Sequence, residues 1–180
     1  MVNINLAYTA PINPPGASPV LTPAQVWTGL QYKVRRAEKF VPVITHCEVL
    51  SEENAPSSSS SASSGSDNTN KTHTITRLAT FRAGAGPKGG GTVKEVCKLH
   101  PPCRIDFVQE DGTTIGNYVS RGPEGELMMT YVFEWRVEGV EEGGEREREL
   151  EGEFAKMAKL AVEGSIETIR KIVRGEIEMD

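Results

Sequence analysis

The chain has 180 residues, 37% hydrophobic and 25% charged, with a formal net charge of -5, and this length suits one domain whose core can enclose a cavity. The negative charge argues against a nucleic-acid-binding surface, which needs clustered lysine and arginine. No apolar run is long enough to cross a bilayer and the first residues do not form an export signal, so we expect a soluble, cytoplasmic protein.

The first forty residues predict a strand followed by two short helices. At the N-terminus, apolar side chains recur at every second position, as in a half-buried strand; they are Val2, Ile4, Leu6 and Tyr8. Thr22 and Pro23 supply an N-cap and a proline in the first turn, which predicts a helix that continues to Leu30. A second short helix is expected to end near Phe40.

The middle of the chain predicts six further strands. They cover residues 43–50, 72–82, 92–99, 103–109, 114–120 and 127–137. Glycine- and proline-rich turns separate the last five, so consecutive strands should pair as antiparallel hairpins. Residues 54–70 are almost all small and polar, and we interpret them as a flexible loop within a single domain that spans residues 1–180.

The C-terminal segment predicts one long helix. After an acidic run, small and apolar side chains follow helical spacing over roughly 25 residues; they are Phe154, Met157, Ala158, Ala161, Ser165, Thr168, Ile169 and Ile172. The predicted fold class is therefore α+β: a curved antiparallel sheet of about seven strands with a long helix that closes the chain.

This order of elements resembles the helix-grip fold of the START and Bet v 1-like superfamily. The local sequence resembles the AtaL-like family, formerly a domain of unknown function; the segments that carry the likeness are Trp27-Thr-Gly-Leu30, Arg36-Ala-Glu-Lys-Phe-Val-Pro42, Thr45-His-Cys-Glu-Val49, Gly116-Asn117-Tyr118 and Tyr131-Val-Phe-Glu-Trp135. The resemblance implies a sheet wrapped around the long helix, with a ligand cavity over its inner face. It also implies a place among genes for specialised metabolites, as for some fungal members, but no particular reaction.

Hairpin geometry predicts which charged side chains share the inner face. A turn near Pro87 would set Arg77 across from Cys97 and diagonally beside Glu95. Because side chains alternate along a strand, Arg77 and Glu95 should then point inward together.

The last hairpins predict two uncharged polar groups on the same face. The register that keeps apolar residues inside brings Asn117 inward and sets it near Tyr131. Cys103 is also expected on this face. The apolar and aromatic residues expected around the polar groups are Phe81, Ile105, Phe107, Met129, Phe133 and Trp135.

Four polar side chains on an apolar face allow two interpretations, because burial of unpaired polar groups is costly. In the first, they orient a mostly hydrophobic guest in a pocket. In the second, Arg77 and Glu95 form an ion pair that fixes the strand register, while Asn117 and Tyr131 bond to the backbone.

The remaining reactive side chains predict neither a metal site nor a cofactor. None of the three histidines has a second ligand at metal-binding spacing, and the three cysteines match no zinc pattern. We expect the cysteines to be reduced thiols.

The functional hypothesis is a small biosynthetic enzyme that binds an aromatic or polyketide-like metabolite and promotes a cofactor-free cyclisation, dehydration or isomerisation. Glu95 would act as acid or base beside Arg77, and Arg77, Asn117 and Tyr131 would hold a carbonyl or enolate oxygen. The alternative is a non-catalytic carrier or chaperone of hydrophobic molecules. A third hypothesis is a protein-binding module that uses the acidic segment and the Ser-rich loop. The protein is expected to be a monomer or a homodimer.

Overall fold

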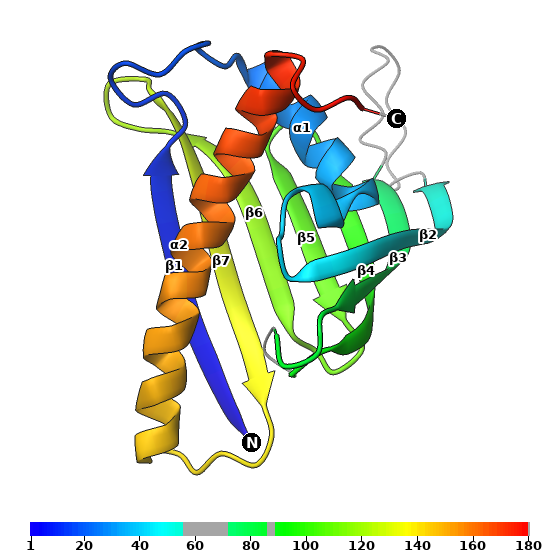
Figure 1. Ribbon diagram of the computed structural model, residues 1–180, viewed down its shortest axis with the longest axis vertical. Coiled ribbons are helices and arrows are strands. Elements are labelled where there is room, and N and C mark those ends of the chain that lie inside the picture. Colours follow the sequence, from blue (N-terminus) through cyan, green and yellow to red (C-terminus); the bar gives the residue numbers. More distant parts are fainter. Residues whose placement is uncertain (56–71, 86–88, 180) are drawn as a thin grey trace, which may run out of the picture.

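The computed structural model describes residues 1–55, 72–85 and 89–179. In this part of the chain, seven strands form one antiparallel sheet in the order β1-β7-β6-β5-β4-β3-β2 (Figure 1). The strands are β1 (Val2–Pro11), β2 (Ile44–Ala55), β3 (Thr72–Phe81), β4 (Gly91–His100), β5 (Arg104–Gln109), β6 (Thr114–Arg121) and β7 (Leu127–Val137). The helices are α1 (Pro23–Arg35), the short 3-10 helix η1 (Ala37–Lys39) and α2 (Glu145–Val173). The predicted helix-grip architecture is confirmed.

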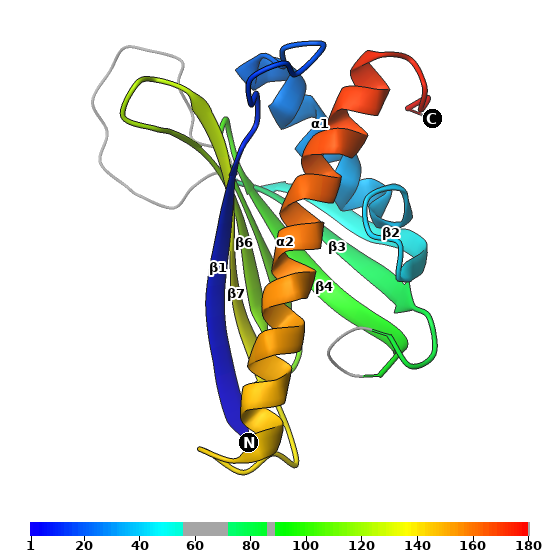
Figure 2. The ribbon, with the colours of Figure 1, turned by 60° about the vertical axis from the view of Figure 1, so that its left-hand side comes forward.

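The sheet curves around the helices, and both α1 and α2 lie on the same face of it (Figure 2). The long helix α2 packs along β1 and β7, and its C-terminal half meets α1. The main hydrophobic core lies between this inner face and the two helices. Among the described residues, no helix has both the length and the apolar character that a membrane span requires.

Helix α1 begins where the sequence predicts and continues one turn further than expected. Thr22 is the N-cap: its Oγ1 accepts from the Gln25 backbone N at 3.3 Å, and the Gln25 side chain accepts from the Thr22 backbone N at 2.9 Å. The helix runs to Arg35 instead of ending at Leu30, and the predicted second helix is the single turn η1. The extra turn carries Lys33 onto the inner face.

Two contacts fix α2 against the rest of the fold. The Arg170 guanidinium donates from Nη2 to the Ile12 carbonyl at 2.6 Å, which joins α2 to the segment that follows β1. A glycine is required where α1 crosses α2, because a Cβ at Gly29 would lie 2.5 Å from Ile169 Cγ1. These contacts hold α2 against α1 and against the segment that follows β1.

The β3–β4 hairpin differs from the predicted register by two residues. Arg77 pairs directly with Glu95, and Cys97 pairs with Ile75 instead of with Arg77. Side chains alternate with period two, so a shift of two positions keeps every side chain on its predicted face. Pro87, where the turn was expected, lies outside the described residues.

Two loop segments differ from the expectations drawn from the sequence. Cys103 is exposed and lies in the turn before β5, because its backbone N bonds to the His100 carbonyl and β5 begins only at Arg104; the prediction that it faces inward is wrong. The first two residues of the predicted flexible loop, residues 54–55, belong to β2, and residues 56–70 lie outside the described part of the chain.

Candidate functional site

The two side chains predicted to be catalytic, Arg77 and Glu95, form a buried ion pair on the inner face. Arg77 and Glu95 each have about 4% of the side chain exposed. Arg77 donates to Glu95 Oε2 from Nε at 2.8 Å and from Nη2 at 2.6 Å. The second carboxylate oxygen, Oε1, accepts from Gln109 Nε2 at 3.0 Å. Both oxygens of Glu95 are therefore engaged by protein donors.

The third nitrogen of Arg77 connects the sheet to the end of α1. Nη1 donates to the Lys33 carbonyl at 2.9 Å and to the Val34 carbonyl at 2.8 Å. Carbonyls in the last turn of a helix lack intrahelical partners and attract cations. The ion pair thus also holds the C-terminal turn of α1 onto the sheet.

Lys33 is a buried basic side chain that was not predicted from the sequence to lie at this site. It is 6% exposed, and its Nζ donates to Tyr131 Oη at 2.9 Å. The amine also lies over the Tyr131 ring, 4.2 Å from its centroid. Burial, reinforced by the positive charge of Arg77, lowers the pKa of Lys33 to about 7, although Glu95 acts in the opposite direction.

Asn117 and Ser165 are buried polar residues of this face whose side chains form no hydrogen bond within the described part of the chain. Asn117 pairs with Tyr131 across the β6–β7 ladder, and its side chain is completely buried. Neither Oδ1 nor Nδ2 of Asn117 has a hydrogen-bond partner among the described residues, nor does Ser165 Oγ from α2. Burial raises the pKa of Tyr131, and the Ser165 hydroxyl nearby opposes that shift. Unpartnered buried polar groups are rare and require an explanation.

The apolar residues predicted around these groups divide into separate regions. Ile105, Phe107 and Met129 are buried on the inner face, and Ile105 pairs with Asn117. Phe133 and Trp135 stack at 4.5 Å between centroids, and Trp135 meets Phe154 of α2 at 4.3 Å. Helix α2 therefore covers the Trp135 end of the face.

Phe81 lies apart from the other predicted site residues. It is half-buried at the end of β3 and packs against a smaller cluster that includes Ile44, Cys47 and Ala79. The structure therefore brings Arg77, Glu95, Asn117 and Tyr131 onto one face but leaves Phe81 at its margin.

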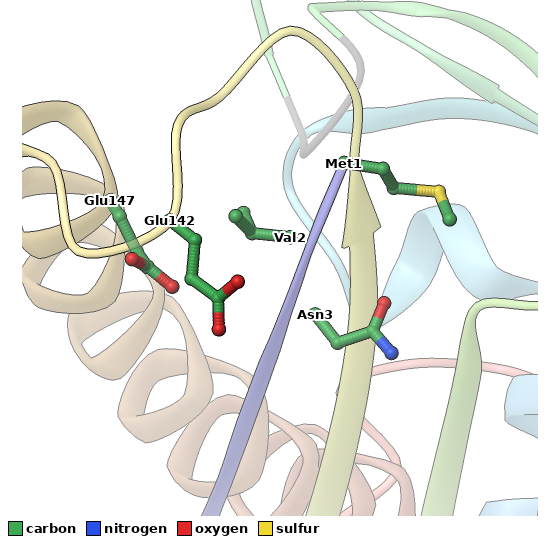
Figure 3. Close-up of a pocket in the computed structure, with 5 residues that line it drawn as sticks. All are labelled: Met1, Val2, Asn3, Glu142 and Glu147. Atoms are coloured by element: carbon green, nitrogen blue, oxygen red, sulfur yellow. The ribbon is translucent and has the colours of Figure 1, made fainter.

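A separate hollow of about 300 Å³ lies at the N-terminal end of β1. Figure 3 shows Glu142 and Glu147, from the loop before α2 and its first turns, beside the start of β1. Met1, Val2 and Asn3 complete the lining. Two carboxylates make this hollow unsuitable for an apolar guest, and it shares no residue with the inner face described above. In residues 1–55, 72–85 and 89–179, no group of three His, Cys, Asp or Glu side chains could hold a metal ion.

The residues missed by sequence reasoning are Lys33, Gln109 and Ser165. Gln109 has the same strand parity as Ile105 and Phe107, and Ser165 follows the helical spacing of the inner face of α2. Lys33 lies seven positions after the buried Val26, which is two helical turns on one face. Had the helix been predicted to continue beyond Leu30, this spacing would have placed Lys33 on its buried face.

Comparisons with known proteins bear on the whole chain. The family described as "Acetylaranotin biosynthesis cluster protein L" matches residues 6–175. A protein of that description from Aspergillus terreus (strain NIH 2624 / FGSC A1156) is 28% identical over 167 residues, which cover 93% of this chain and 88% of the relative.

Two solved structures share the fold. The Zhui aromatase/cyclase from Streptomyces sp. R1128 has a TM-score of 0.57 at 13% identity, over 97% of this chain and 98% of its own. A START superfamily protein from Mycobacterium smegmatis has a TM-score of 0.51 at 10% identity, over 93% of this chain and 98% of its own. Likeness at such identity establishes the fold alone. The family match spans most of the sequence, so the chain belongs to the acetylaranotin biosynthesis cluster protein L family, with the fold of START-like proteins.

Proposed function

We propose that the protein binds a small hydrophobic metabolite of aromatic or polyketide type against the inner face and promotes a cofactor-independent cyclisation, dehydration or isomerisation. The observation that carries this proposal is the Asn117 side chain, which is completely buried on the inner face and has no hydrogen-bond partner for either amide atom among the described residues. An amide of this kind can orient a carbonyl or enol oxygen of a guest. The interpretation in which Asn117 bonds to the backbone does not account for this arrangement.

The comparisons support the substrate class. The relative in Aspergillus terreus is named for a biosynthetic cluster, and the Streptomyces neighbour is named as an aromatase/cyclase. In the proposed complex, Ile105, Phe107 and Met129 contact the apolar body of the ligand. Asn117 and Tyr131 contact its oxygen atoms, while Phe133 and Trp135 form the wall next to α2. The position of Phe81 supports at most a contact at the margin.

Glu95 is the acid or base proposed from the sequence, and its geometry favours a second candidate function. Both of its oxygens already accept hydrogen bonds from Arg77 and Gln109. A carboxylate engaged in this way suits a positioning role. If no other group transfers a proton, the protein is a carrier of the metabolite, which is the second candidate function. Glu95→Gln separates the two: loss of turnover with binding retained assigns proton transfer to Glu95, and unchanged turnover assigns it to positioning.

Native mass spectrometry of protein purified from its own host tests ligand binding. We expect a co-purifying small molecule in the native protein and a reduced occupancy in Asn117→Leu, which removes the amide at similar volume. Asn5→Leu changes the same residue type on the exposed face of β1 and should leave occupancy unchanged. Equal occupancy in both variants would contradict the assignment of the site to this face.

A further inference from the structure

Among the described residues, the Lys33 amine has one hydrogen-bond partner and no acidic partner. Its Nζ bonds to Tyr131 Oη, and within the described residues no carboxylate oxygen lies within 4.0 Å of it. A charged amine in such a site loses hydration that one hydrogen bond and the Tyr131 ring replace only in part. Burial therefore lowers the pKa of Lys33 and increases the fraction of free amine at neutral pH.

The charged and titratable groups around Lys33 come from three strands. Arg77 lies on β3, Glu95 and Cys97 lie on β4, and Tyr131 lies on β7. Arg77 disfavours the ammonium form, while Glu95 favours it, as the thiolate form of Cys97 does at high pH. Burial of the Cys97 thiol raises its own pKa to about 12, so it is uncharged near neutral pH. A pKa of about 7 for Lys33 leaves a substantial fraction of free amine at neutral pH.

Lys33 suits proton abstraction better than Glu95 does. The two oxygens of Glu95 accept from Arg77 and Gln109, whereas the single hydrogen bond of Lys33 uses one of its N–H groups. With Nζ as the donor to Tyr131 Oη, the lone pair of the free amine takes no part in that bond. Proton abstraction needs an available lone pair and a pKa near the working pH.

Tyr131 connects Lys33 to the unpartnered polar groups. Its hydroxyl accepts from Lys33, its backbone pairs with Asn117, and its phenol lies near Ser165. A basic amine and an amide donor therefore flank one side chain on the buried inner face of the sheet. A ligand that supplies both an acidic C–H and an adjacent oxygen would satisfy both groups.

We propose that Lys33 is a further catalytic residue: the base that removes a proton from the carbon between two ketones of a bound β-dicarbonyl ligand. This inference rests on the proposed function and names its substrate class. The C–H bond breaks, its electron pair passes into an enolate shared by the two ketone oxygens, and the proton forms an N–H bond on Lys33 Nζ. Asn117 Nδ2 donates to the enolate oxygen, and the new ammonium lies beside the enolate charge.

The probe for this step is 1-phenylbutane-1,3-dione, an aromatic β-diketone whose enolate absorbs at longer wavelength than its neutral forms. Equilibrium dialysis measures binding, and difference absorption at neutral pH measures the bound enolate. We expect the wild-type protein to bind the probe and show the enolate band. Lys33→Met should bind it and lose the band, whereas Lys159→Met, on the exposed face of α2, should retain the band.

Each outcome separates the two proposals. Binding without an enolate band in wild-type protein, or an equal band in Lys33→Met, overturns the role of Lys33 and leaves ligand binding intact. Absence of binding to wild-type protein overturns the proposed function, and the role of Lys33 with it. If Lys33→Met does not fold, a pH titration of the ε-carbon NMR chemical shift of Lys33 in the wild-type protein decides. A titration midpoint near pH 7 supports the proposal, and a midpoint at the ordinary value of 10.5 overturns it.

Discussion

The buried amine of Lys33 predicts a specific dependence of stability on pH. In the folded protein its pKa is about 7, below the ordinary value of 10.5 that it regains on unfolding. Between these values the unfolded chain binds a proton that the folded chain does not, so the free energy of unfolding rises with pH. Below about pH 7 both states are protonated and this dependence disappears.

The expected magnitude follows from the linkage relation. One proton contributes about 1.4 kcal/mol per pH unit, so wild-type protein should gain about 1.5 kcal/mol between about pH 7 and pH 8.5 from this group. The raised pKa values of Cys97 and Tyr131 have the opposite sign, but they act above the ordinary values of 9.0 and 10.0, outside most of this window. Subtracting the pH dependence of the free energy of unfolding of a variant without Lys33 removes the contribution of Cys97 and Tyr131.

Urea unfolding of wild-type protein, Lys33→Met and Lys159→Met across this window provides the assay. We expect Lys33→Met to lose the rise, while Lys159→Met keeps it because its side chain is exposed. The slope m should stay constant for each protein, so that midpoints report stability. Equal pH dependence in wild type and Lys33→Met would refute the reasoning that Lys33 is neutral in the folded protein.

Two further predictions concern the packing of α1. Arg77→Met should lower the free energy of unfolding, measured by urea titration, by about 3 to 5 kcal/mol, because Glu95 is left as an unpaired buried carboxylate. The double variant Arg77→Met/Glu95→Leu should recover part of this loss. A loss equal to the sum of the two single-variant losses would contradict the ion-pair account. Gly29→Ala should lower the thermal midpoint despite the better helix propensity of alanine, because the added methyl overlaps Ile169 at a cost of about 1 to 3 kcal/mol. The matched change Gly152→Ala, in α2 with open space around it, should raise stability by up to about 1 kcal/mol, and a stabilised Gly29→Ala would show that Ile169 can move aside.

Period-two alternation made the inner face predictable from sequence. Arg77, Glu95, Asn117 and Tyr131 lie on the predicted face even though the β3–β4 register differs by two residues. The apolar pattern of each strand decides which alternate residues face inward, whereas the pairing register between strands also depends on the turn. The direct Arg77–Glu95 pairing therefore required the structure.

The partners of the site were less predictable because they come from separate elements. Lys33 reaches the face only because α1 continues to Arg35, and neither helix length nor the packing angle of α1 follows from local sequence. Ser165 and Gln109 follow the spacing of the inward-facing residues of α2 and β5. A single polar residue at such a position does not by itself predict a functional site. Which polar groups find partners depends on the tertiary packing of α1 and α2 on the sheet.

The most direct test of ligand binding at this face is NMR observation of the Asn117 side-chain amide during a titration with 1-phenylbutane-1,3-dione. The resonance can be assigned by its absence from Asn117→Leu. We predict a saturable shift of the Nδ2 protons and magnetisation transfer between them and the probe. A probe that binds while the Asn117 amide resonance stays unchanged would contradict the account.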